Sequence, residues 1–173
     1  MPSTYVLISS TQLTSTTSSV TFSSIPSTYT DLVVKVSGRS TQTALAASVR
    51  FFINGNTGNV YSFTRLLGTG TGTSTYTSGT GNELYFNNGV SGASSTTNAF
   101  GTAEIYIPNY LSTTNKPMSS QQAQETNSSA ANMGITATLT AITSAITSIE
   151  VATNPGESYV AGSSFYLYGI KNS

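Results

Sequence analysis

Hydrophobic and polar residues alternate along most of this chain with a period of two, which is the spacing typical of β-strands. In the run Ala103–Ile107, the alanine and both isoleucines share one face, and Pro108 ends the strand. Similar runs occupy residues 5–8, 20–22, 32–36, 49–53, 60–66, 83–86, 135–139, 149–151 and 165–170. We therefore expect about ten short strands, with the first and the last in the same core.

Turn residues separate these runs and suggest how two of them pair. Asn54-Gly55 is a strong tight-turn signal, so residues 49–53 and 60–66 are predicted to form a hairpin. Two tracts rich in Gly, Ser and Thr, residues 68–82 and 87–99, bury little and predict long mobile loops.

One segment leaves helix open as an alternative. Residues 136–150 place Leu139, Ile142 and Ile146 at helical spacing, but the segment is rich in threonine and has no N-cap, so strand and loop are favoured. Many short strands without a convincing helix predict an all-β fold. We expect a single antiparallel β-sandwich, or jelly roll, over residues 1–173.

The composition alone is typical of a disordered chain, but the patterning is not. Only 7% of residues are charged, and 29 serines and 30 threonines make up about a third of the chain. Hydrophobic residues nevertheless reach 37% and alternate, and threonine is a good strand former. Six basic and six acidic residues are scattered singly, so no nucleic-acid partner is expected. Neither a signal peptide nor a membrane-spanning stretch is apparent.

The chain has few residues that could perform catalysis. It contains no cysteine and no histidine, its only aspartate is Asp31, and its five glutamates lie far apart in sequence. We therefore expect no catalytic residue, no metal site and no cofactor. A polysaccharide-degrading enzyme built on two glutamates is the least favoured alternative.

The ten tyrosines allow two interpretations. Tyr106, Tyr110, Tyr159, Tyr166 and Tyr168 either pack in the core and across strands, which is favoured, or form a platform on which sugars stack. Under this glycan-binding alternative, Tyr106, Asn109 and Tyr110 are the candidate surface.

Five segments together resemble a family of short virion structural proteins from tailed bacteriophages, especially those that infect cyanobacteria. The segments are residues 5–13 (YVLISSTQL), 25–40 (IPSTYTDLVVKVSGRS), 51–67 (FFINGNTGNVYSFTRLL), 104–120 (EIYIPNYLSTTNKPMSS) and 162–170 (GSSFYLYGI). The stretches IPSTYTDL and YLYGI are the most specific parts.

The resemblance implies a β-rich virion protein and carries over no catalytic or binding residue. We expect a capsid decoration (cement) protein that forms a homotrimer, binds the major capsid protein and stabilises the capsid surface after assembly in the host cytoplasm. The capsid is favoured because the sequence contains no shaft repeat. The alternative is a tail- or head-fibre module that binds a host receptor or a glycan.

Overall fold

The computed structural model describes residues 4–70, 74–125, 127 and 131–171, and within these ranges all regular structure is β. No helix in the described ranges is long and apolar enough to cross a membrane. Twelve strands are present: β1 (Tyr5–Gln12), β2 (Ser19–Phe22), β3 (Asp31–Gly38), β4 (Ala46–Ile53), β5 (Tyr61–Gly68), β6 (Ser74–Gly81), β7 (Leu84–Ser91), β8 (Gly101–Ile107), β9 (Lys116–Glu125), β10 (Ala131–Thr140), β11 (Ile149–Ala152) and β12 (Ser164–Ile170).

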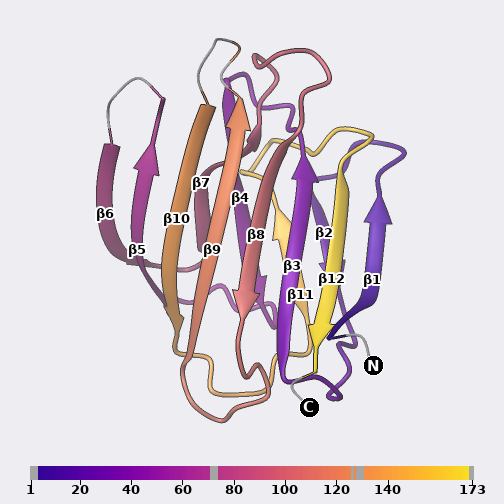
Figure 1. Ribbon diagram of the computed structural model, residues 1–173, viewed down its shortest axis with the longest axis vertical. Coiled ribbons are helices and arrows are strands. Elements are labelled where there is room, and N and C mark those ends of the chain that lie inside the picture. The colour runs from indigo at the N-terminus through magenta and orange to yellow at the C-terminus, as the bar shows by residue number, and fades with distance from the viewer. Residues whose placement is uncertain (1–3, 71–73, 126, 128–130, 172–173) are drawn as a thin grey trace.

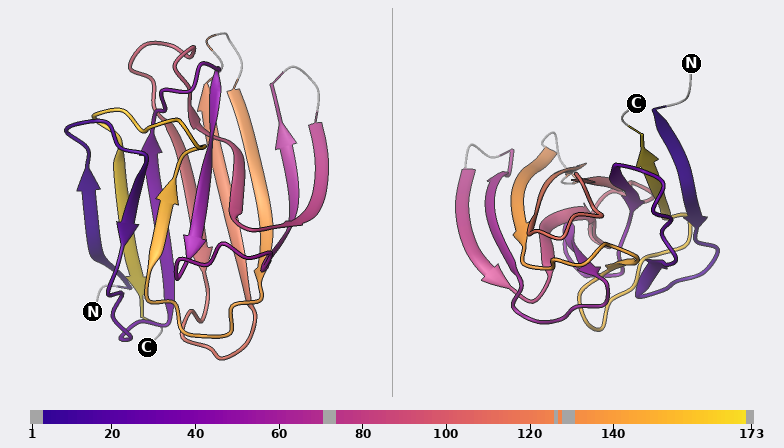
Figure 2. Two further views of the ribbon diagram at one scale, coloured as in Figure 1. Left: turned by 180° about the vertical axis from the view of Figure 1, so that it is seen from behind. Right: turned by 90° about the horizontal axis from the view of Figure 1, so that it is seen from below.

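The strands form two antiparallel sheets that pack face to face, which confirms the predicted β-sandwich (Figures 1 and 2). The larger sheet has the order β1-β12-β3-β8-β9-β10-β5-β6, and the smaller sheet has the order β2-β11-β4-β7. The four strands β1-β12-β3-β8 face the smaller sheet. When the β5–β6 and β9–β10 hairpins are set aside, the remaining eight strands alternate between the two sheets, except that β4 and β7 are neighbours in the smaller one. This alternation is the jelly-roll arrangement of eight strands.

Two hairpins extend the jelly roll on one side. The β5–β6 hairpin is inserted between β4 and β7, and the β9–β10 hairpin is inserted between β8 and β11. The hairpins join each other through β10 and β5, and they join the jelly roll through β8 and β9. We call these four strands the extension; Figure 1 shows them on the left of the front sheet.

The core lies between the two sheets and is built from the expected alternation. Leu32, Val34 and Val36 of β3 point inward, as do Ile105 and Ile107 of β8. From the smaller sheet, Phe51 and Phe86 meet with ring centroids 4.8 Å apart. Burying side chains of this size contributes roughly 1.5 to 3 kcal/mol each, so this cluster is the main source of stability.

The predicted proximity of the chain ends is confirmed. β1 pairs with β12 along its length, from Tyr5 opposite Ile170 to Gln12 opposite Ser164, with a register irregularity between Leu7 and Ser9. Because β12 also pairs with β3, the last strand is an interior member of the larger sheet.

The hairpin predicted between residues 49–53 and 60–66 is wrong. The turn at Asn54-Gly55 does form, with positive φ at both residues, but the chain then crosses to the other sheet. β4 pairs with β11 and β7, whereas β5 pairs with β10 and β6. The side chain of Asn54 holds the crossing in place, since its Oδ1 accepts hydrogen bonds from the backbone of Thr147 and Ser148 at 2.8 and 3.1 Å.

The two predicted loops are also corrected. Of residues 68–82, the part from 74 to 81 is strand β6, paired along its length with β5, and residues 71–73 lie outside the described residues. In the second tract, β7 continues to Ser91. The Arg39 guanidinium then donates hydrogen bonds to the backbone oxygens of Ala93, Ser95, Thr96 and Ala99, at 2.7 to 3.2 Å, and so organises the remaining loop.

One further strand departs from the prediction, and one segment settles an alternative that the sequence left open. Strand β9 was not predicted at all. Residues 136–150, for which helix was an alternative, form the end of β10, an irregular segment and the start of β11, with no helical turn in the segment.

Candidate interaction surface

Several ionisable side chains of the described residues lie in separate pairwise contacts. Among the described residues, no group of three or more His, Cys, Asp or Glu could hold a metal ion. Lys35 pairs with Glu104 at 2.9 Å on the outer face of the larger sheet, and Arg50 pairs with Glu83 on the smaller sheet. These groups are therefore committed to pairwise contacts.

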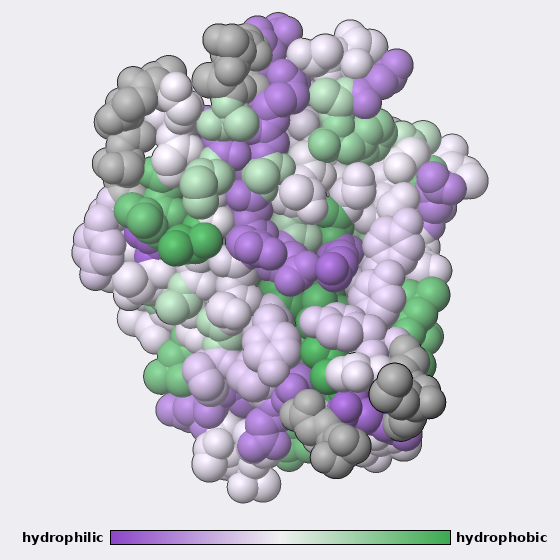
Figure 3. All heavy atoms as spheres, in the orientation of Figure 1, coloured by the Kyte–Doolittle hydropathy of each residue, from purple (hydrophilic) through white to green (hydrophobic). Residues whose placement is uncertain are grey.

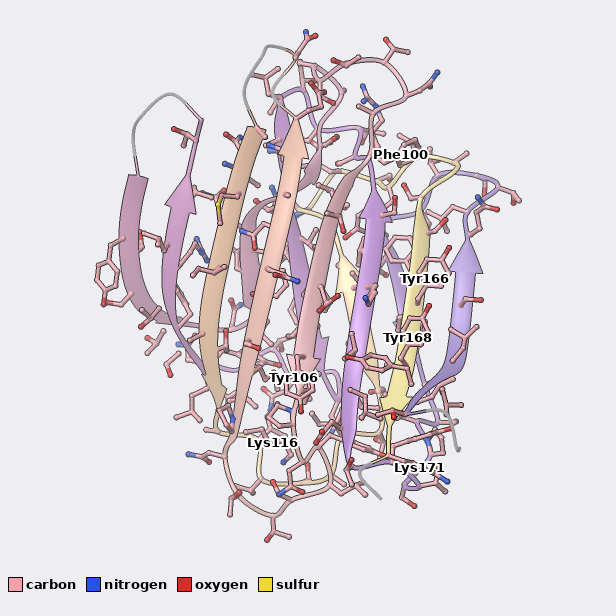
Figure 4. All side chains as sticks on the ribbon, viewed as in Figure 1. Phe100, Tyr106, Lys116, Tyr166, Tyr168 and Lys171 are labelled. Atoms are coloured by element: carbon pink, nitrogen blue, oxygen red, sulfur yellow. The ribbon has the colours of Figure 1, made fainter. Side chains whose placement is uncertain are left out.

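Lys116 is buried and serves as a structural cation. Its ammonium donates to the backbone oxygens of Ser112, Ile142 and Ser144, each at 2.9 Å, and to that of Thr114 at 3.3 Å. Only 1% of the residue is exposed. Lys116 thus ties the loop after β8 to the segment after β10 at the lower end of the molecule (Figure 4).

The three residues proposed for a glycan surface separate into two environments. The Tyr106 hydroxyl donates to Oδ2 of Asp31 at 2.7 Å, and the Asn109 N–H donates to Oδ1 of the same carboxylate at 2.8 Å. The hydrogen bond to Asp31 raises the pKa of Tyr106 to about 12. Tyr110 points the opposite way, into the core, where it is fully buried and donates its hydroxyl proton to the Pro26 carbonyl.

The other tyrosines of the proposed platform are divided in the same way. Tyr159 is fully buried, its ring packs edge-on against Phe165, and burial raises the pKa of its hydroxyl. Tyr166 and Tyr168 lie instead on the outer face of β12 (Figure 4).

A tyrosine row crosses the outer face of the jelly-roll half of the larger sheet. We define it as Tyr5, Tyr106, Tyr166 and Tyr168. Tyr168 and Tyr106 are in register on either side of Val33, about two strand spacings apart, roughly 10 Å. Val33 points outward yet is only 1% exposed, so its neighbours cover it.

The extension carries a different kind of surface on the same face. Five of its outward positions are large, apolar and exposed: Leu66 (48%), Tyr76 (70%), Met133 (53%), Ile135 (47%) and Leu139 (43%). We call these five residues the apolar patch. Figure 3 shows hydrophobic side chains gathered on the left of this face, over β10 and β5. Between the patch and Tyr106 lies a hollow of about 600 Å³, lined also by Ser119, Gln121 and Ala137.

Many inward positions of the extension are polar, although Tyr61, Leu67 and Met118 also point inward and are buried. The polar ones include Arg65, Gln122, Gln124, Asn132, Thr136 and Thr138, all buried. Two of these side chains contact the open edge of β7, which the extension covers: Arg65 Nη2 donates to the Tyr85 carbonyl at 2.5 Å and Gln122 Nε2 to the Asn87 carbonyl at 3.0 Å. Satisfying exposed strand carbonyls requires donors, so polar side chains are needed on the inner side.

The sequence pattern did not reveal the apolar patch. Ile135, Ala137 and Leu139 were correctly assigned to one face of a strand, but that face is directed outward. The residues that alternate with them in the same strand are the buried ones. Thr136, Thr138 and Thr140 are polar but β-branched, and their β-branching was the feature of the sequence compatible with burial in a strand.

No protein-family model matches the chain, and no match is found among curated proteins.

Proposed function

We propose that this chain is a non-enzymatic structural protein of a tailed-phage virion. It acts as a capsid decoration protein that forms homotrimers, binds the major capsid protein and stabilises the capsid surface, and it is assembled in the host cytoplasm. The proposal combines the sequence resemblance described above with the reversed polarity of β10 and the exposed apolar patch around it.

The reversed polarity is the observation that carries self-association. In a sandwich, the apolar face of each sheet ordinarily points inward and the polar face contacts water. In β10 the order is reversed: Met133, Ile135 and Leu139 point outward, while Asn132, Thr136 and Thr138 point inward. Leu66 of β5 and Tyr76 of β6 enlarge this exposed apolar cluster. An exposed apolar cluster of this kind is typical of an interaction site.

A second copy of the chain is the occupant that the patch fits best. None of the described outward positions of β5, β6 and β10 carries a charge. Like surfaces can therefore meet without charge repulsion and without the cost of desolvating ions. In a closed trimer the same patch of each copy can meet the other two around the three-fold axis, and capsid lattices provide three-fold axes that such a trimer matches.

The proposed decoration protein would act by adding contacts between neighbouring capsomers. Each copy contributes a modest free energy of binding to the capsid. Three copies linked in one trimer bind the capsid more tightly than three separate copies would. The jelly roll supplies a rigid body for this purpose, and the same architecture occurs in viral capsid and lectin domains.

The experiment measures the mass of the purified protein by light scattering during size-exclusion chromatography at micromolar concentration. We expect a trimer for the wild type and a monomer for the double variant L66K/I135K. Thr21→Lys, on the exposed side of the smaller sheet, is the control and should remain trimeric. A monomeric wild type would refute self-association.

The particle itself tests the location. In a cryo-electron reconstruction of the virion, the proposal requires density for this chain on the capsid at lattice-related positions. Density confined to the tail, in a few copies, would instead establish the fibre alternative.

A further inference from the structure

The tyrosine row has a chemistry that the apolar patch lacks. Tyr5 lies on β1, Tyr166 and Tyr168 lie on β12, and Tyr106 lies on β8. The ion pair between Lys35 of β3 and Glu104 of β8 lies on the same face. In register, Tyr166 lies opposite Lys35, and Lys35 lies opposite Glu104. Rings and hydrogen-bonding groups therefore share one continuous stretch of the outer face.

The rings are held in place before any ligand arrives. Tyr166 and Tyr168 stack with centroids 6.3 Å apart and planes inclined by 23°, and Tyr5 meets Tyr168 edge-on, also at 6.3 Å. Tyr106 is fixed through its hydroxyl by Asp31. Pre-organised tyrosines offer a large amphipathic contact area and lose little conformational entropy on binding.

The polar groups beside the rings present both donors and acceptors at no net charge. The Lys35 and Glu104 side chains are 48% and 30% exposed, so their ammonium and carboxylate remain accessible to a ligand. Gln121, also exposed, is in register with Glu104 and adds an amide.

We propose that the tyrosine row binds a neutral oligosaccharide. The apolar C–H faces of sugar rings would stack on the Tyr166 and Tyr168 rings, and ring hydroxyls would hydrogen-bond with Lys35, Glu104 and Gln121. A nucleic acid is disfavoured because the single cation of the site is already neutralised by Glu104. A second copy of the chain is assigned to the apolar patch. The patch begins on β10, which is two strand spacings from Tyr106 on β8, roughly 10 Å, and four from Tyr166 and Tyr168 on β12, roughly 19 Å.

Sugar binding by the tyrosine row and self-association through the apolar patch are separate proposals, and either can be wrong without the other. Light scattering tests self-association, whereas a sugar titration tests the tyrosine row. The tyrosine row also relocates the glycan alternative, since Tyr110 is buried and Tyr106 belongs to the row.

The experiment titrates the full chain with maltohexaose, cellohexaose, laminarihexaose and mannohexaose, using NMR chemical shifts and calorimetry. We expect at least one hexasaccharide to bind at millimolar concentration or below and to shift signals of β12, β3 and β8. Tyr166→Ala and Tyr168→Ala should each weaken binding roughly tenfold. Tyr166→Phe, which keeps the ring, should retain it.

The matched control is Tyr76→Ala, which removes an exposed tyrosine of the apolar patch and should leave sugar binding unchanged. Circular dichroism and thermal melting establish that each variant is folded. The proposal is overturned if no hexasaccharide binds, if Tyr76→Ala abolishes binding as strongly as Tyr168→Ala does, or if the row variants lose capsid attachment while sugar binding is unaffected.

Discussion

Ile135 and Leu66 face each other across β10 and β5 on the outside of the sandwich, and each is about half exposed. Their immediate neighbours in sequence, Thr136 and Arg65, also face each other, but on the buried side. At these two pairs of positions the apolar side chains therefore lie outside and the polar ones inside, the reverse of the arrangement in the core strands.

The first prediction compares the same substitution on the two sides of the sheet. Ile105→Ala removes a fully buried side chain of β8 and should lower the free energy of unfolding by about 2 to 5 kcal/mol. Ile135→Ala removes a half-exposed one and should cost clearly less in a monomeric background such as L66K. Urea unfolding followed by circular dichroism measures both, and equal losses would contradict the assignment of Ile135 to the surface.

The second prediction concerns the buried ammonium of Lys116. Lys116→Met keeps the aliphatic stem but leaves four backbone oxygens without their donor, so we expect a loss of about 2 to 4 kcal/mol in unfolding free energy. Lys35→Met breaks a partly exposed ion pair and should cost at most about 1 kcal/mol. Thermal and chemical denaturation of the two variants, measured side by side, compares their losses of unfolding free energy.

The third prediction concerns the loop after β7. Arg39→Ala removes all the guanidinium bonds to residues 93–99, so amide hydrogen exchange there should accelerate while the core strands stay protected. The turn at residues 54–58 is an internal reference and should exchange as in the wild type. Unchanged protection of the 93–99 backbone would show that Arg39 does not organise this loop.

The fourth prediction is a pH dependence. The pKa of Tyr106 is raised from 10.0 to about 12 by its hydrogen bond to Asp31. Between these values the unfolded chain releases the tyrosine proton while the folded chain keeps it, so the stabilising contribution is complete below pH 10 and is lost as the pH rises to about 12. Tyr106→Phe should reduce the loss of stability over this interval, measured by melting temperature, whereas Tyr76→Phe should not.

Much of the fold was predictable because the jelly-roll strands follow the expected alternation, as Ala103, Ile105 and Ile107 do in β8. Strand β9 was missed because its inward positions, such as Ser120, Gln122 and Gln124, are polar. Strand β6 consists of Ser, Thr, Gly and a single tyrosine, so composition indicated a loop. Which sheet the chain joins after Asn54-Gly55 depends on tertiary contacts, and no local signal in the sequence specifies it.

The candidate surface was predictable only in part, for a related reason. Tyr106 and Asn109 do lie together, but one residue later Tyr110 turns into the core, where its hydroxyl reaches the Pro26 carbonyl. Which face of the neighbouring strand β9 is buried depends on the open edge of β7, since Gln122 donates to the carbonyl of Asn87, 35 positions away in the chain. Spacing alone contains no information about that edge.

The order of the strands restricts how this architecture can change between related chains. β5 has only β10 and β6 as sheet neighbours, whereas β9 and β10 are attached to the jelly roll through β8. The β5–β6 hairpin can therefore be lost by itself, leaving β10 as a new edge, but loss of the β9–β10 hairpin would leave β5 and β6 without a sheet to join. In this sheet the β5–β6 hairpin therefore depends on the β9–β10 hairpin for its place, and the apolar patch needs residues of both hairpins.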